Sequence, residues 1–343
     1  MKALVLKEYK QFSYEDVPVP EIGEDDVLIR VKACGICGSD VHGIDGSTGR
    51  RIPPIIMGHE AAGVIERVGS RVTDWKVGER VTFDSTIVLR PDFYSQKGVF
   101  NLSDYRKVLG VSCGEYRQHG AFAEYVAVPQ SILYHLPEKL SFAQAAMVEP
   151  VSVAFHGVSL LDIEINDSAV VFGCGMIGLF IVQALRIKGC GEIIAVDLDQ
   201  SRLDTALKFG ADHAFNGKDP EILEKIKKLT HGRGADVALE AVGITSTIDT
   251  AIRSVRKGGQ VVLVGNLATK VEVPLQIIIT HQLRITGSCA SAGEYPACLD
   301  MIANGRVKVD EMISAVAPLT EAAAWFERLY KGEPGLMKVI IAP

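Results

Sequence analysis

Ala169-Val170-Val171-Phe172-Gly173-Cys174-Gly175-Met176-Ile177-Gly178 is the stretch that decides the fold of the second half of this chain. A short apolar run ends in a G-x-G-x-x-G motif, and residues 176–188 then show helical spacing. This order of strand, glycine turn and helix is typical of dinucleotide-binding βαβ units. The three glycines allow a tight turn, a close approach of backbone to a pyrophosphate, and packing of helix on strand. The alternative is a glycine turn that binds no ligand.

Apolar runs and helical stretches continue to alternate further along the chain. Strands are expected at 192–196, 237–239, 261–264 and 284–286, and helices at 201–209, 219–229 and 245–256. This alternation is typical of a doubly wound parallel sheet. We therefore predict an α/β fold in which residues 151–287 form a Rossmann-type nucleotide-binding domain.

Asp197 ends the second expected strand, nineteen residues after Gly178. An acidic side chain at this place accepts hydrogen bonds from the adenosine ribose and repels a 2′-phosphate, and Asp199 adds a second negative charge. The sequence therefore predicts NAD rather than NADP. The alternative role of Asp197 is a helix N-cap, and that of Arg202 is a solvated helix arginine instead of an adenine contact. The predicted cofactor-binding residues are Gly173, Gly175, Ile177, Gly178, Asp197, Arg202, Val264 and Gly265.

The first part of the chain is rich in β-branched residues and turns. Short strands are expected at 27–31, 62–68 and 77–81, with glycine between them. This part is predicted to be an all-β, barrel-like domain. After residue 290 we expect helices at 295–304 and 321–330 and a last strand at 337–341, and spacing alone does not decide which domain they join.

Cys37, His59 and Glu60 are the candidate metal ligands of the first part. A thiolate, an imidazole and a carboxylate together suit zinc, and three protein ligands leave a fourth position for water or substrate. Two alternatives stay open on spacing alone. Cys34 and Cys37 form a C-x-x-C that could be a redox pair, and a lone His59 could be structural.

Composition limits the class of protein. Hydrophobic residues make up 48% and charged residues 23% of 343 residues, and the formal net charge is −6. This composition is typical of a soluble globular protein, and the net charge argues against a surface for nucleic acid or anionic membranes. Seven scattered cysteines do not suggest a secreted disulfide framework. No apolar run has the length of a membrane span, so a cytoplasmic protein with free thiols is expected.

Longer motifs carry a resemblance. The stretch Gly58-His59-Glu60-x-x-Gly63-x5-Gly69-x-x-Val72, with Gly78-Glu79-Arg80-Val81 and Gly120-Ala121-Phe122-Ala123-Glu124-Tyr125, resembles the zinc signature of medium-chain alcohol dehydrogenases. The whole chain resembles their sorbitol, galactitol-phosphate and threonine dehydrogenase branch. The resemblance implies a GroES-like β-barrel catalytic domain at 1–150, the nucleotide-binding domain at 151–287, and a return to the catalytic domain at 288–343.

The resemblance also assigns roles to residues. Cys37, His59 and Glu60 become ligands of one catalytic zinc, and Glu149 a further acid that binds the metal directly or through water. Ser39 matches the hydroxyl that takes the alcohol proton. From there the relay runs through the nicotinamide ribose to His42. The alternatives for Ser39 and His42 are turn and surface roles.

Two positions depart from the family pattern. Where relatives hold a structural zinc with four cysteines, residues 88–104 carry Leu89, Asp92, Ser95 and Ser103, so one zinc per chain is expected. We expect this lobe to be held by packing of Phe93, Tyr94 and Phe100. In addition, Ala290 stands where sorbitol dehydrogenases have a polyol-binding arginine, which argues against sorbitol itself.

The predicted function is oxidation of a secondary alcohol, on a polyol or a cyclic or phosphorylated relative, to a ketone with reduction of NAD. The alternatives are a threonine dehydrogenase-like enzyme, a zinc-free quinone reductase-like protein and a noncatalytic NAD-binding regulator. The intact ligand set argues against the second, and Ser39 with His42 against the third. The partners expected are a small-molecule alcohol and further copies of the chain, as a dimer or tetramer, because the expected strand at 284–286 is placed by the resemblance at a sheet edge that pairs across a two-fold axis.

Overall fold

A computed structural model describes residues 1–343, and contacts within it divide the chain into two compact units. Unit 1 comprises Met1–Glu149 and Tyr295–Pro343, and unit 2 comprises Pro150–Glu294. The chain thus returns to unit 1 at Tyr295 rather than at the expected residue 288. The physical reason is that Ser288 N donates to Leu263 O, and the Glu294 carboxylate lies 2.7 Å from His156 Nδ1, both within unit 2.

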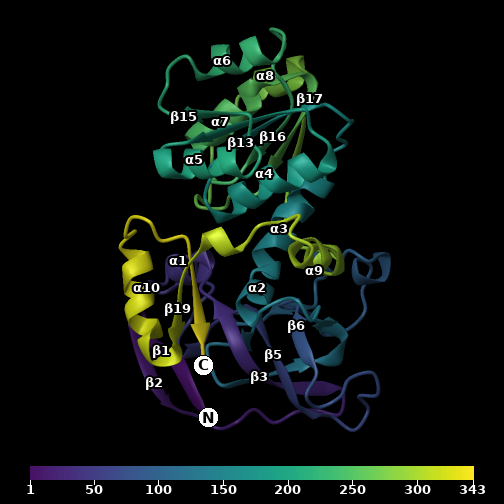
Figure 1. Ribbon diagram of the computed structural model, residues 1–343, viewed down its shortest axis with the longest axis vertical. Helices are drawn as coiled ribbons and strands as arrows, with labels where there is room; N and C mark the ends of the chain where they lie inside the picture. The colour runs from purple at the N-terminus through teal and green to yellow at the C-terminus, as the bar shows by residue number, and fades with distance from the viewer. The chain divides into compact units, whose positions relative to one another are not determined.

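Unit 2 is built on a parallel sheet, as predicted, but the sheet has six strands, and β15 (His213–Asn216) was not among the strands expected. Helices α4 and α5 cover one face of the sheet, and α6 and α7 cover the other (Figure 1). The strand order, β15-β14-β13-β16-β17-β18, is that of the doubly wound dinucleotide-binding fold. The strands are β13 (Ser168–Phe172), β14 (Glu192–Asp197), β15 (His213–Asn216), β16 (Ala235–Glu240), β17 (Val255–Leu263) and β18 (Arg284–Gly287). The helices are α3 (Val148–Ser159), whose first two residues belong to unit 1, α4 (Met176–Lys188), α5 (Gln200–Lys208), α6 (Ile222–Leu229), α7 (Thr245–Ser254) and α8 (Leu275–Thr280).

The glycine motif turns β13 into α4 in the way the sequence predicts. Gly173 has φ +90°, and a Cβ on Gly178 would lie 1.7 Å from the carbonyl oxygen of Gly173, so both positions require glycine. A Cβ on Gly175 would meet no protein atom within 4 Å. Protein packing therefore does not explain the second glycine, whereas the close approach of a ligand does.

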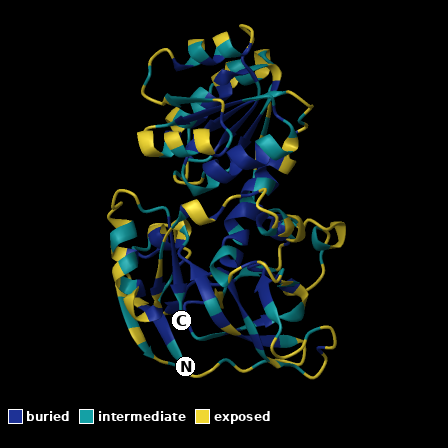
Figure 2. Ribbon diagram, in the orientation of Figure 1, coloured by how far each residue is buried: buried dark blue, intermediate teal, exposed yellow.

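Unit 1 is mostly antiparallel β-structure. Its seven-stranded sheet has the order β12-β6-β5-β3-β20-β19, with β11 also paired to β3. The central strands of both sheets, such as β3 and β13, are mostly buried (Figure 2). Val27 and Ile65 share a core with Phe326 and Val339 from the end of the chain. The strands are β1 (Lys2–Glu8), β2 (Gln11–Asp16), β3 (Asp26–Gly35), β4 (Ile55–Ile56), β5 (Glu60–Val68), β6 (Arg80–Phe83), β7 (Thr86–Val88), β8 (Arg106–Val108), β9 (Val111–Ser112), β10 (Arg117–Gln118), β11 (Tyr125–Pro129), β12 (Leu133–His135), β19 (Ile313–Pro318) and β20 (Lys338–Ala342).

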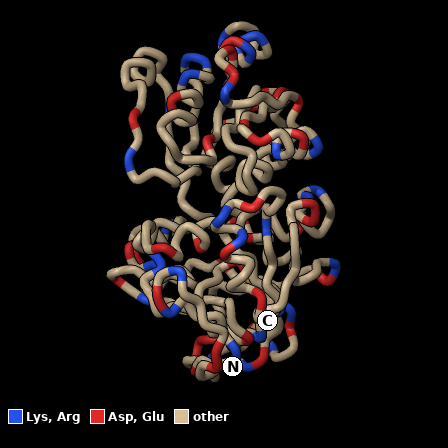
Figure 3. The backbone as a smooth tube through the Cα atoms, turned by 90° about the vertical axis from the view of Figure 1, so that its left-hand side faces the viewer, with Lys and Arg blue, Asp and Glu red and all other residues tan.

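Four α-helices complete unit 1: α1 (Gly38–Gly43), α2 (Phe142–Ala146), α9 (Tyr295–Ala303) and α10 (Ala322–Tyr330). No helix of the chain has the length and apolar character needed to cross a membrane. Lysine and arginine are interspersed with aspartate and glutamate along both units (Figure 3), in agreement with the small net charge.

The lobe at 88–104 is organised by hydrogen bonds on Asp92, and the expected role of Phe93 in packing is wrong, since that side chain is 64% exposed. Asp92 Oδ1 accepts from Ser95 N at 2.8 Å, and Oδ2 accepts from Ser103 Oγ and Asp104 N, each at 2.8 Å. Hydrogen bonds thus join three of the four positions at which relatives hold cysteine, namely Asp92, Ser95 and Ser103. These bonds involve the carboxylate of Asp92 and the hydroxyls of the two serines. The Ser95 N–H and the Ser103 hydroxyl lower the pKa of Asp92 to about 2.

We expect Asp92→Asn to loosen this lobe, because a neutral amide offers one acceptor oxygen where the carboxylate uses two. Hydrogen exchange at the amides of Ser95 and Asp104 should become faster by on the order of tenfold or more. Asp104→Asn leaves the Asp92 carboxylate intact and should not change the exchange rate of either amide. In the wild type the contribution of Asp92 to lobe stability should be complete above about pH 4 and be lost as the pH falls toward 2. Exchange rates that are the same in both variants would contradict this role.

Candidate metal centre and cofactor site

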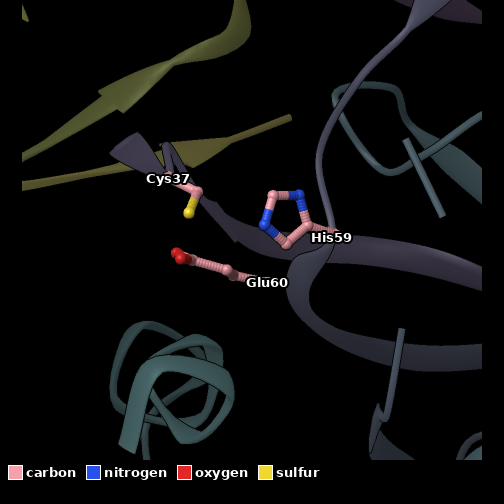
Figure 4. Close-up of side chains that lie close together, drawn as sticks. All are labelled: Cys37, His59 and Glu60. Atoms are coloured by element: carbon pink, nitrogen blue, oxygen red, sulfur yellow. The ribbon is translucent and has the colours of Figure 1, made fainter. Parts of the chain in front are cut away.

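Strand pairing brings the three predicted metal ligands together in unit 1. Cys37 follows β3 and precedes α1, and Glu60 begins β5, where it pairs with Gly35 of β3. The ligand atoms of Cys37, His59 and Glu60 all lie within 4.8 Å of one another. Figure 4 shows the sulfur, a ring nitrogen and the carboxylate facing each other.

The residues present fit a zinc ion. Glu60 is 1% exposed, and its Oε1 has no hydrogen-bond partner, which leaves a buried negative oxygen facing the cluster. Such an atom is costly without a cation. A thiolate, an imidazole and a carboxylate are the donor types that zinc binds, and three of them leave one position open for substrate.

Lys338 of β20 brings a buried positive charge to this cluster, and the sequence did not predict it. Its ammonium donates to Glu60 Oε2 at 2.5 Å and to Ile36 O at 3.0 Å, and both charged side chains are 1% exposed. Lys338 thereby fixes one oxygen of Glu60 and leaves the other for a metal. A lysine within a short strand carries no sequence signal for this contact, because its partner is 278 residues away.

Asp40 supports His59 from the other side. Asp40 is fully buried, and its Oδ1 lies 3.5 Å from His59 Nδ1, which makes no hydrogen bond, so the contact between them is one of charge. Burial alone would lower the pKa of His59, but the charges of Asp40 and Cys37 raise it well above its usual value. Burial would raise the pKa of Asp40, but His59 and Arg51 hold it well below its usual range. An acid that orients a ligating histidine is a common feature of zinc centres.

Glu149, the predicted fourth acid, lies in the first turn of α3 and outside the group of three ligand atoms. The pKa of Glu149 is raised to about 7, mainly by burial; the charge of His59 opposes this shift and that of Glu60 adds to it. The structure therefore places Glu149 within electrostatic reach of the cluster, but it does not bring its carboxylate among the three ligands.

The predicted relay residues lie on α1, next to the cluster. Ser39 Oγ donates to Cys37 Sγ at 3.3 Å. His42 is exposed, three residues further along the same short helix, so both side chains lie on one side of it. The C-x-x-C alternative fits poorly, because Cys34 is fully buried and burial raises the pKa of its thiol well above the usual value.

In unit 2, a cavity of about 620 Å³ opens at the carboxyl ends of the strands that flank β13. Three predicted cofactor residues, Gly173, Asp197 and Arg202, line it. Gly175, Ile177, Gly178, Val264 and Gly265 do not line this cavity. The cavity therefore fits the adenosine end of a dinucleotide, next to the open space at Gly175.

The N-cap alternative for Asp197 is excluded. Asp199 is the N-cap residue of α5, and its side chain accepts from Ser201 N at 2.8 Å. Asp197 Oδ2 instead accepts from Cys174 N at 2.6 Å, and Oδ1 from Asp199 N at 2.9 Å. Asp197 thus joins the end of β14 to the glycine loop and lies at the rim of the cavity.

Glu240, at the end of β16, was not predicted. It is fully buried, and its carboxylate accepts from Gly243 N at 2.8 Å and Thr247 Oγ1 at 2.7 Å. Its carbonyl oxygen accepts from Val264 N and Gly265 N. Two of the predicted cofactor residues are therefore held in place by one buried glutamate.

Comparison with known proteins agrees with this architecture. Residues 23–138 match the family described as "Alcohol dehydrogenase GroES-like domain", and residues 177–304 match "Zinc-binding dehydrogenase". The chain belongs to the zinc-dependent medium-chain alcohol and polyol dehydrogenases, a family of oxidoreductases that use zinc and a nicotinamide cofactor.

Individual relatives cover essentially the whole chain. Sorbitol dehydrogenase of Bacillus subtilis (strain 168) is 34% identical in an alignment of 348 positions, which covers 100% of this chain and 97% of that protein. Among solved structures, 2R,3R-butanediol dehydrogenase from Bacillus subtilis has a TM-score of 0.89 and 31% identity, over 100% of this chain and 99% of that one. A zinc-binding dehydrogenase from Sinorhizobium meliloti 1021 bound to NADP has a TM-score of 0.90 and 31% identity, over 100% and 99%.

Proposed function

We propose that this protein oxidises a secondary alcohol of a small polyol, or of a cyclic or phosphorylated polyol, to a ketone and transfers the hydride to NAD. The observation that carries the proposal is the cluster of Cys37, His59 and Glu60, with one unpartnered carboxylate oxygen, in a chain whose other unit has a dinucleotide cavity. In this proposal Cys37, His59 and Glu60 hold one zinc, and Glu149 acts on it directly or through water.

Zinc, when bound, supplies a Lewis acid that makes the alcohol hydroxyl easier to deprotonate. Ser39 Oγ, 3.3 Å from Cys37 Sγ, takes the proton of the alcohol, and His42 at the exposed end of α1 passes it to solvent. The residues of unit 2 bind and orient NAD, whose nicotinamide carries out the hydride chemistry.

The residue at position 290 favours a polyol other than sorbitol as the substrate. Ala290, where sorbitol dehydrogenases have an arginine, cannot hydrogen-bond a hydroxyl, and its φ of +51° belongs to a tight turn. A threonine dehydrogenase-like activity is the second candidate within the family.

The test is NAD reduction with a panel of polyols, sugar phosphates, inositols and threonine, on protein whose zinc content is measured by elemental analysis. We expect one zinc per chain and the highest kcat/KM on a substrate with neighbouring hydroxyls. Two zinc ions per chain, or higher kcat/KM on threonine than on every polyol, would contradict the proposal. Quinone reduction by zinc-free protein would support the rival function.

NAD preference is the second part of the proposal, supported by the position of Asp197 at the cavity. Asp197→Ala should weaken NAD binding by about tenfold to a hundredfold, because hydrogen bonds from the ribose hydroxyls to a carboxylate are lost. NADP binding should change less, since its 2′-phosphate gains from the removal of a negative charge. Asp204→Ala, which removes an exposed charge of α5 that does not line the cavity, is the control and should change the binding of neither cofactor. Equal kcat/KM for NAD and NADP in the wild type would overturn the assignment.

A homo-oligomer and a cytoplasmic location stay predictions. The oligomer is supported by β18, which ends the six-stranded sheet with β17 as its one partner strand and three of its four residues exposed. An unpaired sheet edge of this kind is normally covered.

A further inference from the structure

Arg51 is a buried guanidinium in the loop after α1, and the proposed function gives it no role. Its side chain is 3% exposed. Its Nε and Nη2 donate to Asp40 Oδ1 at 3.0 and 2.8 Å, and Nη1 donates to Arg50 O at 2.9 Å. A Cβ on Gly43 would lie 2.4 Å from Arg51 Cγ, so α1 packs directly on this side chain. The guanidinium is therefore held in one orientation.

The same guanidinium reaches the hydroxyl proposed to take the alcohol proton. Arg51 Nη2 lies 3.3 Å from Ser39 Oγ and donates to it. A serine hydroxyl has one proton to donate and two places to accept. In this structure the proton goes to Cys37 Sγ, and Arg51 fills one acceptor place. One acceptor place remains to receive the alcohol proton, and the hydroxyl passes its own proton on by turning it away from Cys37 Sγ while Arg51 holds the oxygen in place.

Arg51 also reaches the metal ligands through Asp40. Asp40 Oδ1, which accepts from Arg51, is the atom that lies 3.5 Å from His59 Nδ1. Asp40 Oδ2 accepts from Cys37 N at 3.4 Å. The guanidinium of Arg51 thus connects the hydroxyl of Ser39 to Asp40. Asp40 in turn contacts two of the proposed metal ligands, His59 and Cys37.

We propose that Arg51 is a positioning residue: it orients the Ser39 hydroxyl for proton transfer and holds it in register with the metal centre through Asp40. This inference rests on the proposed function. The positive charge beside Ser39 Oγ also favours the partial negative charge that this oxygen carries while a proton passes. Lysine cannot replace arginine here, because a single ammonium does not supply a planar fork to two acceptors.

The experiment is a double-mutant cycle of Arg51→Lys and Ser39→Ala, read in two ways. The first readout is kcat for polyol oxidation, which should fall by on the order of tenfold or more in Arg51→Lys, with little change in the KM for NAD. In the Ser39→Ala background the same change should have almost no further effect on kcat. Arg256→Lys, which alters the guanidinium–carboxylate pair with Asp236 in unit 2, should leave kcat unchanged.

The second readout does not depend on turnover. In protein loaded with cobalt(II) in place of zinc, the thiolate-to-metal charge-transfer band reports the hydrogen bond that Ser39 donates to Cys37. Loss or misorientation of that bond makes the sulfur a better electron donor and moves the band to lower energy. We expect this shift in Arg51→Lys and in Ser39→Ala, and no larger shift in the double variant.

The possible outcomes distinguish a failure of this inference from a failure of the proposed function. Independent effects of the two substitutions on kcat, or an unshifted band in Arg51→Lys, would show that Arg51 does not act through Ser39. Loss of bound cobalt in Arg51→Lys alone would assign Arg51 to metal retention instead. A wild-type protein that takes up cobalt without a thiolate band would overturn the metal centre, and this inference with it.

Discussion

Cys37→Ser should abolish NAD reduction by the polyol, with a loss of at least about a thousandfold in kcat. The three-residue cluster contains one thiolate, and its replacement by a neutral hydroxyl removes a ligand and a negative charge. Zinc content should fall well below one per chain. NAD affinity should stay within about twofold, because the cavity at Gly173 and Asp197 belongs to unit 2. Steady-state kinetics measures the loss of kcat, elemental analysis the zinc content, and cofactor titration the NAD affinity.

Cys34→Ser is the matched control. Cys34 is fully buried, its sulfur lies 3.9 Å from Gly35 O, and burial raises the pKa of its thiol well above the usual value. We therefore expect a change in packing and nearly normal turnover. Equal loss of activity in the two serine variants would support a redox pair and would contradict the metal centre.

Lys338→Met should destabilise the metal-free protein by about 3–5 kcal/mol, because it leaves the Glu60 carboxylate buried without its counterion. Zinc should reduce this loss, since a bound cation neutralises the same carboxylate and stabilises the folded state to which it binds. The measurement is the shift of the urea midpoint with and without zinc. A shift of the same size under both conditions would show that Glu60 does not face the metal.

The control for that prediction is Glu60→Gln combined with Lys338→Met. Without a charge on either side chain, the metal-free double variant should regain more than half of the lost stability. A double variant as unstable as Lys338→Met would mean that the lysine acts through packing of its alkyl chain and not through its charge.

The fold of unit 2 could be predicted from its sequence because local pattern and tertiary structure agree there. The glycine motif begins α4 at Met176, as expected, since Gly173 and Gly178 meet at a distance that only glycine allows. In unit 2, helix α8 and strand β15 were not predicted, and in unit 1 strand β19 was not predicted. The run Leu275–Thr280 is short, and its three isoleucines are consecutive, so it has no period that separates helix from strand. Strand β19 is stabilised by pairing with β20 rather than by its own sequence.

The candidate metal ligands could be predicted because zinc restricts both residue type and spacing. Their supports could not. Asp40 follows Cys37 closely, but an aspartate in a short helix is usually a cap. From the sequence alone, Arg51 and Lys338 are expected to be solvated charges, but in the fold both are buried. In the lobe at 88–104 the aromatic residues suggested packing, whereas hydrogen bonds to the Asp92 carboxylate hold the lobe together.

The pairing of Lys338 with Glu60 bears on the order in which a newly made chain can mature. The residues of unit 2 are contiguous from Pro150 to Glu294, so this unit can fold on the ribosome as soon as they emerge. Strand β3 and Glu60 are made long before, yet they acquire their neighbour β20 and its ammonium only after the whole of unit 2 has been translated. The buried carboxylate of Glu60 is therefore without its lysine partner for as long as unit 2 is being made.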